Sequence, residues 1–159
     1  MRDLYQQYER MWFRLCLRYA PDRSQAEDIL QEGLIYIFKD LHQFDETKSK
    51  FSTWSSRVLV NAALRFIRKN QWQQAFEDIE SIPKKEPFYE DIIGQITAKE
   101  LTKIIQSLPT GYRIIFNMYE IEGYTHREIA EKLEISTGTS KSQLSKAKRM
   151  LRKKIELLF

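Results

Sequence analysis

The residues of this sequence that are best placed to do chemistry are basic and lie near its carboxyl end. Seven lysines and arginines occur from Lys141 to Lys154, and no acidic residue interrupts them. Four polar residues in this stretch are spaced four, three and four apart and would share one stripe of a helix: Lys141, Ser145, Lys148 and Arg152. A helix fits the major groove of DNA, where lysine and arginine reach phosphates and guanine edges. The stripe therefore predicts contact with duplex DNA, and the alternative is a solvated charged face.

A second stripe combines aromatic, amide and cationic side chains. Its members recur every three or four residues: Trp54, Arg57, Asn61, Arg65 and Arg68. Four further residues extend it: Lys69, Asn70, Gln71 and Trp72. Unpaired bases stack on aromatic rings, arginines follow phosphates and an amide can recognise a base edge. We therefore expect this stripe to bind single-stranded DNA, although Trp54 could instead be a core residue, because tryptophan is usually buried.

A third group is polar and acidic. Asp28, Gln31 and Glu32 fall at positions i, i+3 and i+4, on the side of a helix opposite its apolar residues, which leaves them free for a partner. They offer too few oxygens for a metal site, so we expect no metal. The sequence also has no phosphate loop, glycine-rich dinucleotide motif or recognisable nucleophile. We therefore expect a protein without enzymatic activity or cofactor.

Composition narrows the class of protein. The chain has 159 residues, of which 42% are hydrophobic, and this is enough for one ordinary domain or two small ones. A single cysteine, Cys16, excludes an internal disulfide and a cysteine-based zinc site. No apolar run approaches the ~20 residues of a membrane span. We expect a cytoplasmic protein that does not insert into a membrane.

The distribution of charged residues and prolines divides the chain into three parts. Residues 1–72 hold 12 basic and 9 acidic residues, residues 73–95 hold 2 and 6, and residues 96–159 hold 12 and 7. The middle part also contains two prolines and lacks a sustained apolar stripe, so it is expected to be a flexible acidic linker. Apolar residues elsewhere recur every three or four positions. The fold class is therefore predicted to be all-α, with two small helical domains.

Residues typical of helix ends place the acidic group and the stripe from Trp54 to Trp72 on two helices of the amino-terminal domain. A first helix should run from about residue 3 to residue 19 and stop before Pro21. Ser24 and Glu27 match a capping box that would open the second helix. The third helix is expected from about residue 51 through residue 68.

The carboxyl-terminal domain should begin with a helix from about residue 96 to residue 107, with Pro109 suited to the start of the next helix. Thr125 and Glu128 form another capping box, which opens a short helix through residue 133. After a turn, Ser136 caps a long final helix whose buried side is predicted to hold five residues: Leu144, Ala147, Leu151, Ile155 and Leu158. A short helix, a tight turn and a longer basic helix make a helix-turn-helix.

At these residues the chain resembles a bacterial extracytoplasmic-function (ECF) sigma factor of the sigma-70 family, the minimal promoter-specificity subunit of RNA polymerase. Residues 26–32 with Phe44 and Asp45 match its polymerase-binding helix, and residues 51–54 leading to Asn61 match its promoter-melting helix. In the second domain the matching segments are 108–113, 122–131 and 138–142.

The resemblance implies a transcription initiation factor with residues 1–72 as sigma region 2 and residues 96–159 as region 4. Asp28, Gln31 and Glu32 would dock on the clamp helices of the beta-prime subunit of core RNA polymerase, and the second domain on its beta flap. The second stripe, from Trp54 to Trp72, would capture unpaired bases of the minus-ten element. The minus-thirty-five duplex would be recognised by six residues: Thr139, Lys141, Ser142, Ser145, Lys146 and Arg149. An anti-sigma factor is a further expected partner.

The sequence also departs from the family pattern. Glu134 stands where the turn usually has glycine, which costs about 1 kcal/mol if a positive φ is required. Arg65 replaces a frequent aspartate and adds charge to the melting face. Two other functions stay open at this point: a stand-alone helix-turn-helix repressor or activator whose first domain senses a ligand or dimerises, and a metal-dependent nuclease.

Overall fold

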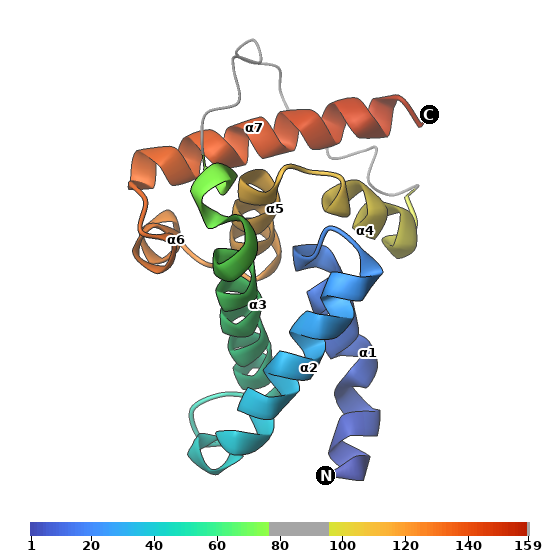
Figure 1. Ribbon diagram of the computed structural model, residues 1–159, viewed down its shortest axis with the longest axis vertical. Coiled ribbons are helices and arrows are strands. Elements are labelled where there is room, and N and C mark those ends of the chain that lie inside the picture. The colour runs from blue at the N-terminus through green and yellow to red at the C-terminus, as the bar shows by residue number, and fades with distance from the viewer. Residues whose placement is uncertain (77–95, 159) are drawn as a thin grey trace. The chain divides into compact units, whose positions relative to one another are not determined.

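Every regular element in the described part of the chain is a helix (Figure 1). The computed structural model describes residues 1–76 and 96–158, apart from the side chains of residues 70–74. This confirms the all-α class. The chain forms two compact units, residues 1–72 and residues 73–159, and each is described by itself. The predicted linker lies outside the described residues from position 77 onward.

The first unit contains α1 (Arg2–Tyr19), α2 (Arg23–Lys39), the 3₁₀ turn η1 (Leu41–Gln43) and α3 (Phe51–Ala75) as far as residue 72. The expected end of the first helix before Pro21 is confirmed. The expected end of the third helix at Arg68 is wrong, because α3 continues to Ala75. No proline or glycine interrupts the chain between those two positions, so nothing local stops the helix there.

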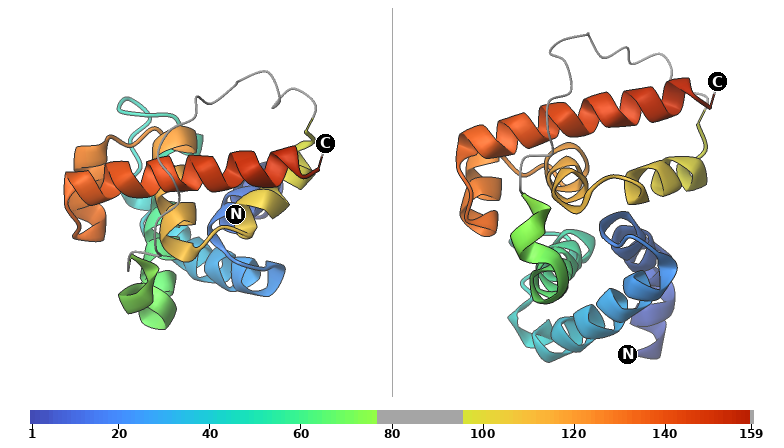
Figure 2. Two further views of the ribbon diagram at one scale, coloured as in Figure 1. Left: turned by 90° about the horizontal axis from the view of Figure 1, so that it is seen from above. Right: turned by 45° about the horizontal axis from the view of Figure 1, so that its top comes forward.

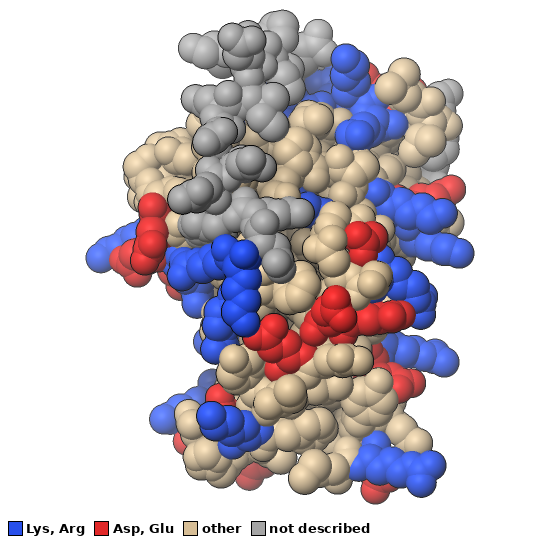
Figure 3. Space-filling model, in the orientation of Figure 1, with Lys and Arg blue, Asp and Glu red and all other residues tan. Residues whose placement is uncertain are grey.

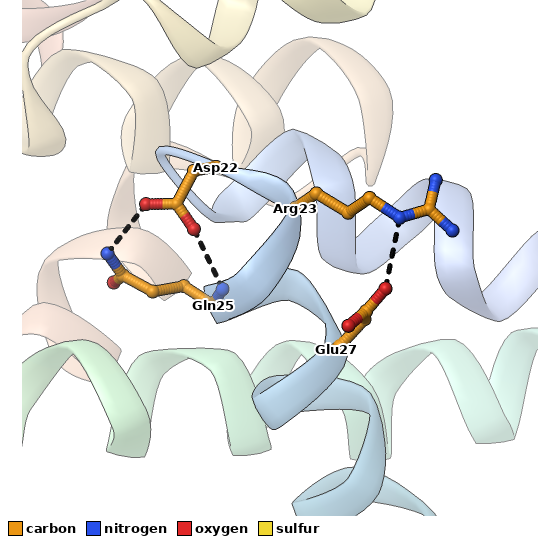
Figure 4. Close-up of polar contacts among 4 residues, drawn as sticks. All are labelled: Asp22, Arg23, Gln25 and Glu27. Atoms are coloured by element: carbon orange, nitrogen blue, oxygen red, sulfur yellow. Dashed lines mark hydrogen bonds and ion pairs between the residues drawn. The ribbon is translucent and has the colours of Figure 1, made fainter.

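The start of α2 also corrects a prediction. Asp22, and not Ser24, is the capping residue: its Oδ1 accepts the backbone N–H of Gln25 at 2.8 Å (Figure 4). The Glu27 carboxylate, which was expected to complete a capping box with Ser24, instead accepts from Arg23 Nε at 3.0 Å. Because Asp22 stands two residues before Ser24 in extended geometry, the helix begins earlier than the Ser24 pattern indicates.

The core of the first unit joins all three of its long helices. Trp12 of α1 is fully buried, and its indole Nε1 donates to Oγ of Ser55 in α3 at 3.0 Å. Gly33 of α2 lies so close to Leu59 of α3 that a β-carbon at position 33 would clash with the leucine side chain. A hydrogen bond on one side and a close backbone approach on the other therefore set where α3 lies.

The second unit contains α4 (Ala98–Gln106), α5 (Thr110–Phe116), the π-helical turn η3 (Asn117–Ile121), α6 (His126–Leu133) and α7 (Thr137–Glu156). Both views of Figure 2 show α7 running across α5, with α6 at its amino-terminal end and α4 toward its carboxyl-terminal end. The core beneath α7 and α4 consists of Ile104, Ile105, Leu108, Tyr112, Ala147, Leu151 and Ile155.

The predicted boundaries of this unit hold at most positions. Thr97 and Glu100 form a capping box that starts α4 at Ala98, slightly later than expected. The Thr125–Glu128 capping box and the Ser136 cap are both confirmed. Leu158 was predicted on the buried side of the final helix, but it is 60% exposed because α7 ends at Glu156.

Within the described residues, none of the helices is both long and apolar enough to cross a membrane.

Candidate nucleic-acid interface

The turn between α6 and α7 is tight and strained at one residue. Glu134 has φ of 57° and ψ of 44°, which is left-handed geometry. The backbone N–H of Ile135 then donates to the carbonyl of Ala130 at 3.1 Å, which closes the end of α6. Glu134 therefore adopts the positive φ for which glycine is the favoured residue. This turn sets the direction in which α7 leaves α6.

The amino-terminal half of α7 presents a polar face to solvent. Lys141, Ser142 and Ser145 are exposed, while Gln143 and Leu144 between them are buried. Thr139, which was expected to contact DNA, is partly buried, and its hydroxyl accepts from Oγ of the cap Ser136 at 2.9 Å. The structure thus leaves three of the six expected duplex-binding residues exposed: Lys141, Ser142 and Ser145. Lys146 and Arg149 are partly buried, and each interacts with other groups of the protein.

The carboxyl-terminal half of the same stripe is already paired within the protein. Nζ of Lys148 forms an ion pair with Oε1 of Glu120, a residue of η3. Nε of Arg152 donates to Oε1 of Glu156 at 2.9 Å. The stripe predicted from spacing is therefore divided, with Lys141 and Ser145 at its open end. An ion pair at the protein surface typically contributes about 0–1 kcal/mol, so breaking this one would cost little.

His126 belongs to this surface, and sequence reasoning did not select it. Its Nδ1 lies 2.8 Å from Oγ of Ser140, and its ring stacks on Tyr119 with a centroid distance of 4.4 Å and an interplanar angle of 22°. Burial lowers the pKa of His126, and the charges of Lys141 and Lys148 lower it further. The only feature of the sequence that could have pointed to His126 is its position directly after the capping threonine.

The second stripe lies on α3 as expected, and most of its cations are accessible. Arg57, Arg65, Arg68 and Lys69 are exposed, and Asn61 is partly buried. The Arg65 guanidinium lies 4.1 Å from the ring centroid of Tyr36 in α2, and its Nε donates to the Asn61 carbonyl at 3.3 Å. The residue that departs from the family pattern is therefore held against α2 by a cation–π contact.

Trp54 is neither fully exposed nor a full core residue. It is partly buried, and its ring lies 5.6 Å from that of Phe44 and 5.7 Å from that of Phe51, measured between centroids. The packed part of the ring fixes its orientation, and the rest of its surface stays accessible. Asn70, Gln71 and Trp72 lie within α3, but their side chains are outside the described residues.

The acidic group lies on α2 as predicted. Asp28 and Gln31 are exposed and Glu32 is half-buried. Figure 3 shows carboxylates gathered over α2 in this view. Ile35 follows them at helical spacing and is 65% exposed. No group of three or more histidine, cysteine or acidic side chains that could hold a metal occurs in the described parts of the two units.

Comparison with known families covers both units. Residues 4–73 match the family described as Sigma-70 region 2, and residues 98–151 match Sigma-70, region 4. The chain belongs to the ECF sigma factors of the sigma-70 family. The region 2 match includes α3 as far as residue 73, with its aromatic and cationic stripe, and the region 4 match includes α7 as far as residue 151.

Curated relatives of this sigma factor carry the same family name. The ECF RNA polymerase sigma factor SigM of Bacillus subtilis is 27% identical, over 94% of this chain and 91% of its own length. SigE of Mycolicibacterium smegmatis is 26% identical over 94% of this chain, which spans 59% of that relative. The fold is similar to that of the sigma factor RpoE in a complex with the anti-sigma factor NepR from Bartonella quintana, with a TM-score of 0.55, 21% identity and 96% coverage of both chains.

This sigma factor directs RNA polymerase to promoters as an alternative transcription initiation factor. The region 2 match disfavours the stand-alone repressor or activator, whose first domain would have to be a sensor or dimerisation domain.

Proposed function

We propose that the two units recognise different states of promoter DNA. The second unit, as region 4, holds the minus-thirty-five element as duplex through α7. The first unit, as region 2, holds unpaired bases of the minus-ten element on α3 and docks on core polymerase through α2. The sigma factor carries out no chemistry of its own in this scheme and acts in the cytoplasm.

The observation that carries the duplex assignment is the open end of α7. Lys141, Ser142 and Ser145 are exposed together on a helix that is fixed by the Ser136 cap and by its buried opposite side. A lysine and two short hydroxyl side chains can reach phosphates and base edges when the helix lies in the major groove. The partly buried Lys146 and Arg149 would add phosphate contacts at the edge of this surface.

Two variants with the same loss of charge test this assignment. Lys141→Ala should weaken binding of the holoenzyme to a promoter duplex by about 5- to 100-fold and leave binding to core polymerase unchanged. Lys99→Ala removes another exposed lysine, from α4, and should change neither quantity. Equal losses in DNA and polymerase binding for Lys141→Ala would contradict the assignment.

The unpaired-DNA assignment depends on α3. Arg57, Arg68 and Lys69 are exposed cations along the helix that also carries the partly buried Trp54 and Asn61, while Arg65 is oriented by Tyr36. Base stacking contributes about 1–3 kcal/mol per base in such sites. Trp54→Ala should therefore reduce open-complex formation on a closed promoter more than on a template with a pre-melted bubble.

The polymerase contact is proposed for the polar face of α2, with Asp28, Gln31 and Glu32 against the clamp helices. Glu32→Lys should abolish capture of core polymerase, while Glu46→Lys, an exposed residue before α3, should not. A second contact, with the beta flap, fits a groove of about 440 Å³ between α4 and the end of α7. Ile96, Ile104, Leu157 and Leu158 supply its apolar lining.

An anti-sigma factor is proposed as an inhibitory partner. The supporting observation is the fold shared with a sigma factor whose structure contains an anti-sigma factor. A protein that binds both units would compete with core polymerase, so adding it should reduce the fraction of sigma factor captured by the core enzyme.

A further inference from the structure

His126 connects three consecutive elements of the second unit. It is the first residue of α6, its ring stacks on Tyr119 of η3, and its Nδ1 lies 2.8 Å from Oγ of Ser140 in α7. Ser140 is fully buried and immediately precedes Lys141. The histidine therefore fixes the part of α7 that carries the exposed DNA-binding residues.

The partner of His126 is a hydroxyl group, and this determines how the contact responds to protonation of the imidazole. A serine hydroxyl is both a donor and an acceptor. A neutral imidazole with an unprotonated Nδ1 accepts the Ser140 O–H, and a protonated imidazole donates its Nδ1–H to the Ser140 oxygen. The link between α6 and α7 can thus persist in both protonation states, while the charge of the surface changes by one.

We propose that His126 is a positioning residue for duplex recognition, which holds α7 through Ser140 and adds a proton-dependent positive charge to the DNA-binding surface. The inference rests on the proposed function of α7 and extends it to a residue that contacts the helix from outside.

The charged groups around His126 determine the direction of the pH effect. Lys141 and Lys148 face it from α7, Tyr119 and Glu120 belong to η3, and Glu120 is paired with Lys148. On α6 itself, the neighbouring Arg127 pairs with Glu131, with 3.5 Å between Nε and Oε1.

In the free protein, burial and the two lysines keep the pKa of His126 below its ordinary value, so the imidazole is neutral at neutral pH. Phosphates near Lys141 would offset the lysine charges and raise the pKa of His126 in the complex. The bound state then takes up a proton, and affinity for duplex rises as the pH falls through the interval between the two pKa values.

The test uses holoenzyme and a promoter fragment selected from a randomised duplex library by the wild-type holoenzyme. Dissociation constants are measured between about pH 6 and about pH 8. His126→Asn places an amide near Nδ1 and cannot become charged, so it should stay within about 3-fold of wild type at the higher pH and lose the tightening at the lower pH.

Two variants remove the link itself. His126→Phe keeps a ring on Tyr119 without the hydrogen bond, and Ser140→Ala removes the partner hydroxyl. Each should weaken promoter binding by about 3- to 10-fold at the higher pH, and the double variant should be no weaker than the weaker single variant, because both remove the same interaction. Capture of core polymerase, which depends on the first unit, should be unchanged, and a cooperative urea transition followed by far-ultraviolet circular dichroism checks that the variants are folded.

The outcomes separate this inference from the proposed function. If holoenzyme carrying Lys141→Ala keeps full promoter affinity, the assignment of α7 fails. If Lys141→Ala weakens binding but His126→Phe and Ser140→Ala do not, the positioning role of His126 is overturned. If His126→Asn keeps the full pH dependence of the wild type, the proton-dependent charge belongs to another group and that part of the proposal is wrong. If His126→Phe fails to fold, Ser140→Ala and His126→Asn still decide both parts.

Discussion

Replacing Glu134 by glycine should stabilise this sigma factor. Glu134 has φ of 57° in the turn between α6 and α7, and it is exposed, so its side chain gains little from packing. A residue with a β-carbon pays roughly 1–2 kcal/mol for left-handed geometry. Glycine avoids this cost but loses about 0.5–1 kcal/mol more conformational freedom on folding. The difference predicts a net gain of about 0.5–1 kcal/mol in the free energy of unfolding.

The matched control is the same substitution three residues earlier. Glu131 is also exposed, but it lies within the right-handed geometry of α6 and pairs with Arg127. Glu131→Gly should therefore destabilise by about 1 kcal/mol, with a few tenths more from the lost ion pair. Glu134→Ala, which removes the carboxylate and keeps a β-carbon, should stay within about 0.5 kcal/mol of wild type.

Urea denaturation of the full chain, followed by far-ultraviolet circular dichroism, measures these differences as shifts of the midpoint at constant slope. The two glycine variants should move the midpoint in opposite directions. If Glu134→Gly destabilises the protein as Glu131→Gly does, the left-handed residue carries no cost that glycine relieves, and the reasoning from φ is refuted.

Three further predictions follow from buried groups and from charge. Ser55→Ala should lower the free energy of unfolding by about 1–3 kcal/mol, because it leaves the buried Trp12 indole N–H without its acceptor. Ser56→Ala is the control. Equal urea midpoints for the two variants would contradict the assigned role of the Trp12–Ser55 hydrogen bond. Burial raises the pKa of the Cys16 thiol to about 12, so Cys16 should not react with a thiol reagent near neutral pH until urea unfolds the chain. The pKa of His126 is lower in the folded state than its ordinary value of 6.5, so the unfolded state binds more protons once the pH falls to about 6.5. The free energy of unfolding should therefore fall as the pH falls through that value. His126→Asn should reduce this loss, as measured by urea midpoints on either side of that pH, and an unchanged loss would assign it to other groups.

Features that depend on neighbouring residues can be predicted from the amino-acid sequence alone. The Thr125–Glu128 box and the Ser136 cap are hydrogen bonds that span three residues, so their residue types specify them wherever the chain turns into a helix. The same local character explains the end of α1 before Pro21. Where two capping residues compete, as Asp22 and Ser24 do, the pattern alone does not decide between them.

The contacts that fix the helices and pair the side chains of the candidate surfaces join residues far apart in the chain. Lys148 meets Glu120, Arg65 meets Tyr36, and Trp12 meets Ser55. A helical stripe states which side chains share a face, but their partners depend on how helices pack, and several packings are compatible with one periodicity. Spacing therefore identifies α7 as a basic helix, whereas the packing of η3 and α6 against it determines that Lys141 is open and Lys148 is paired.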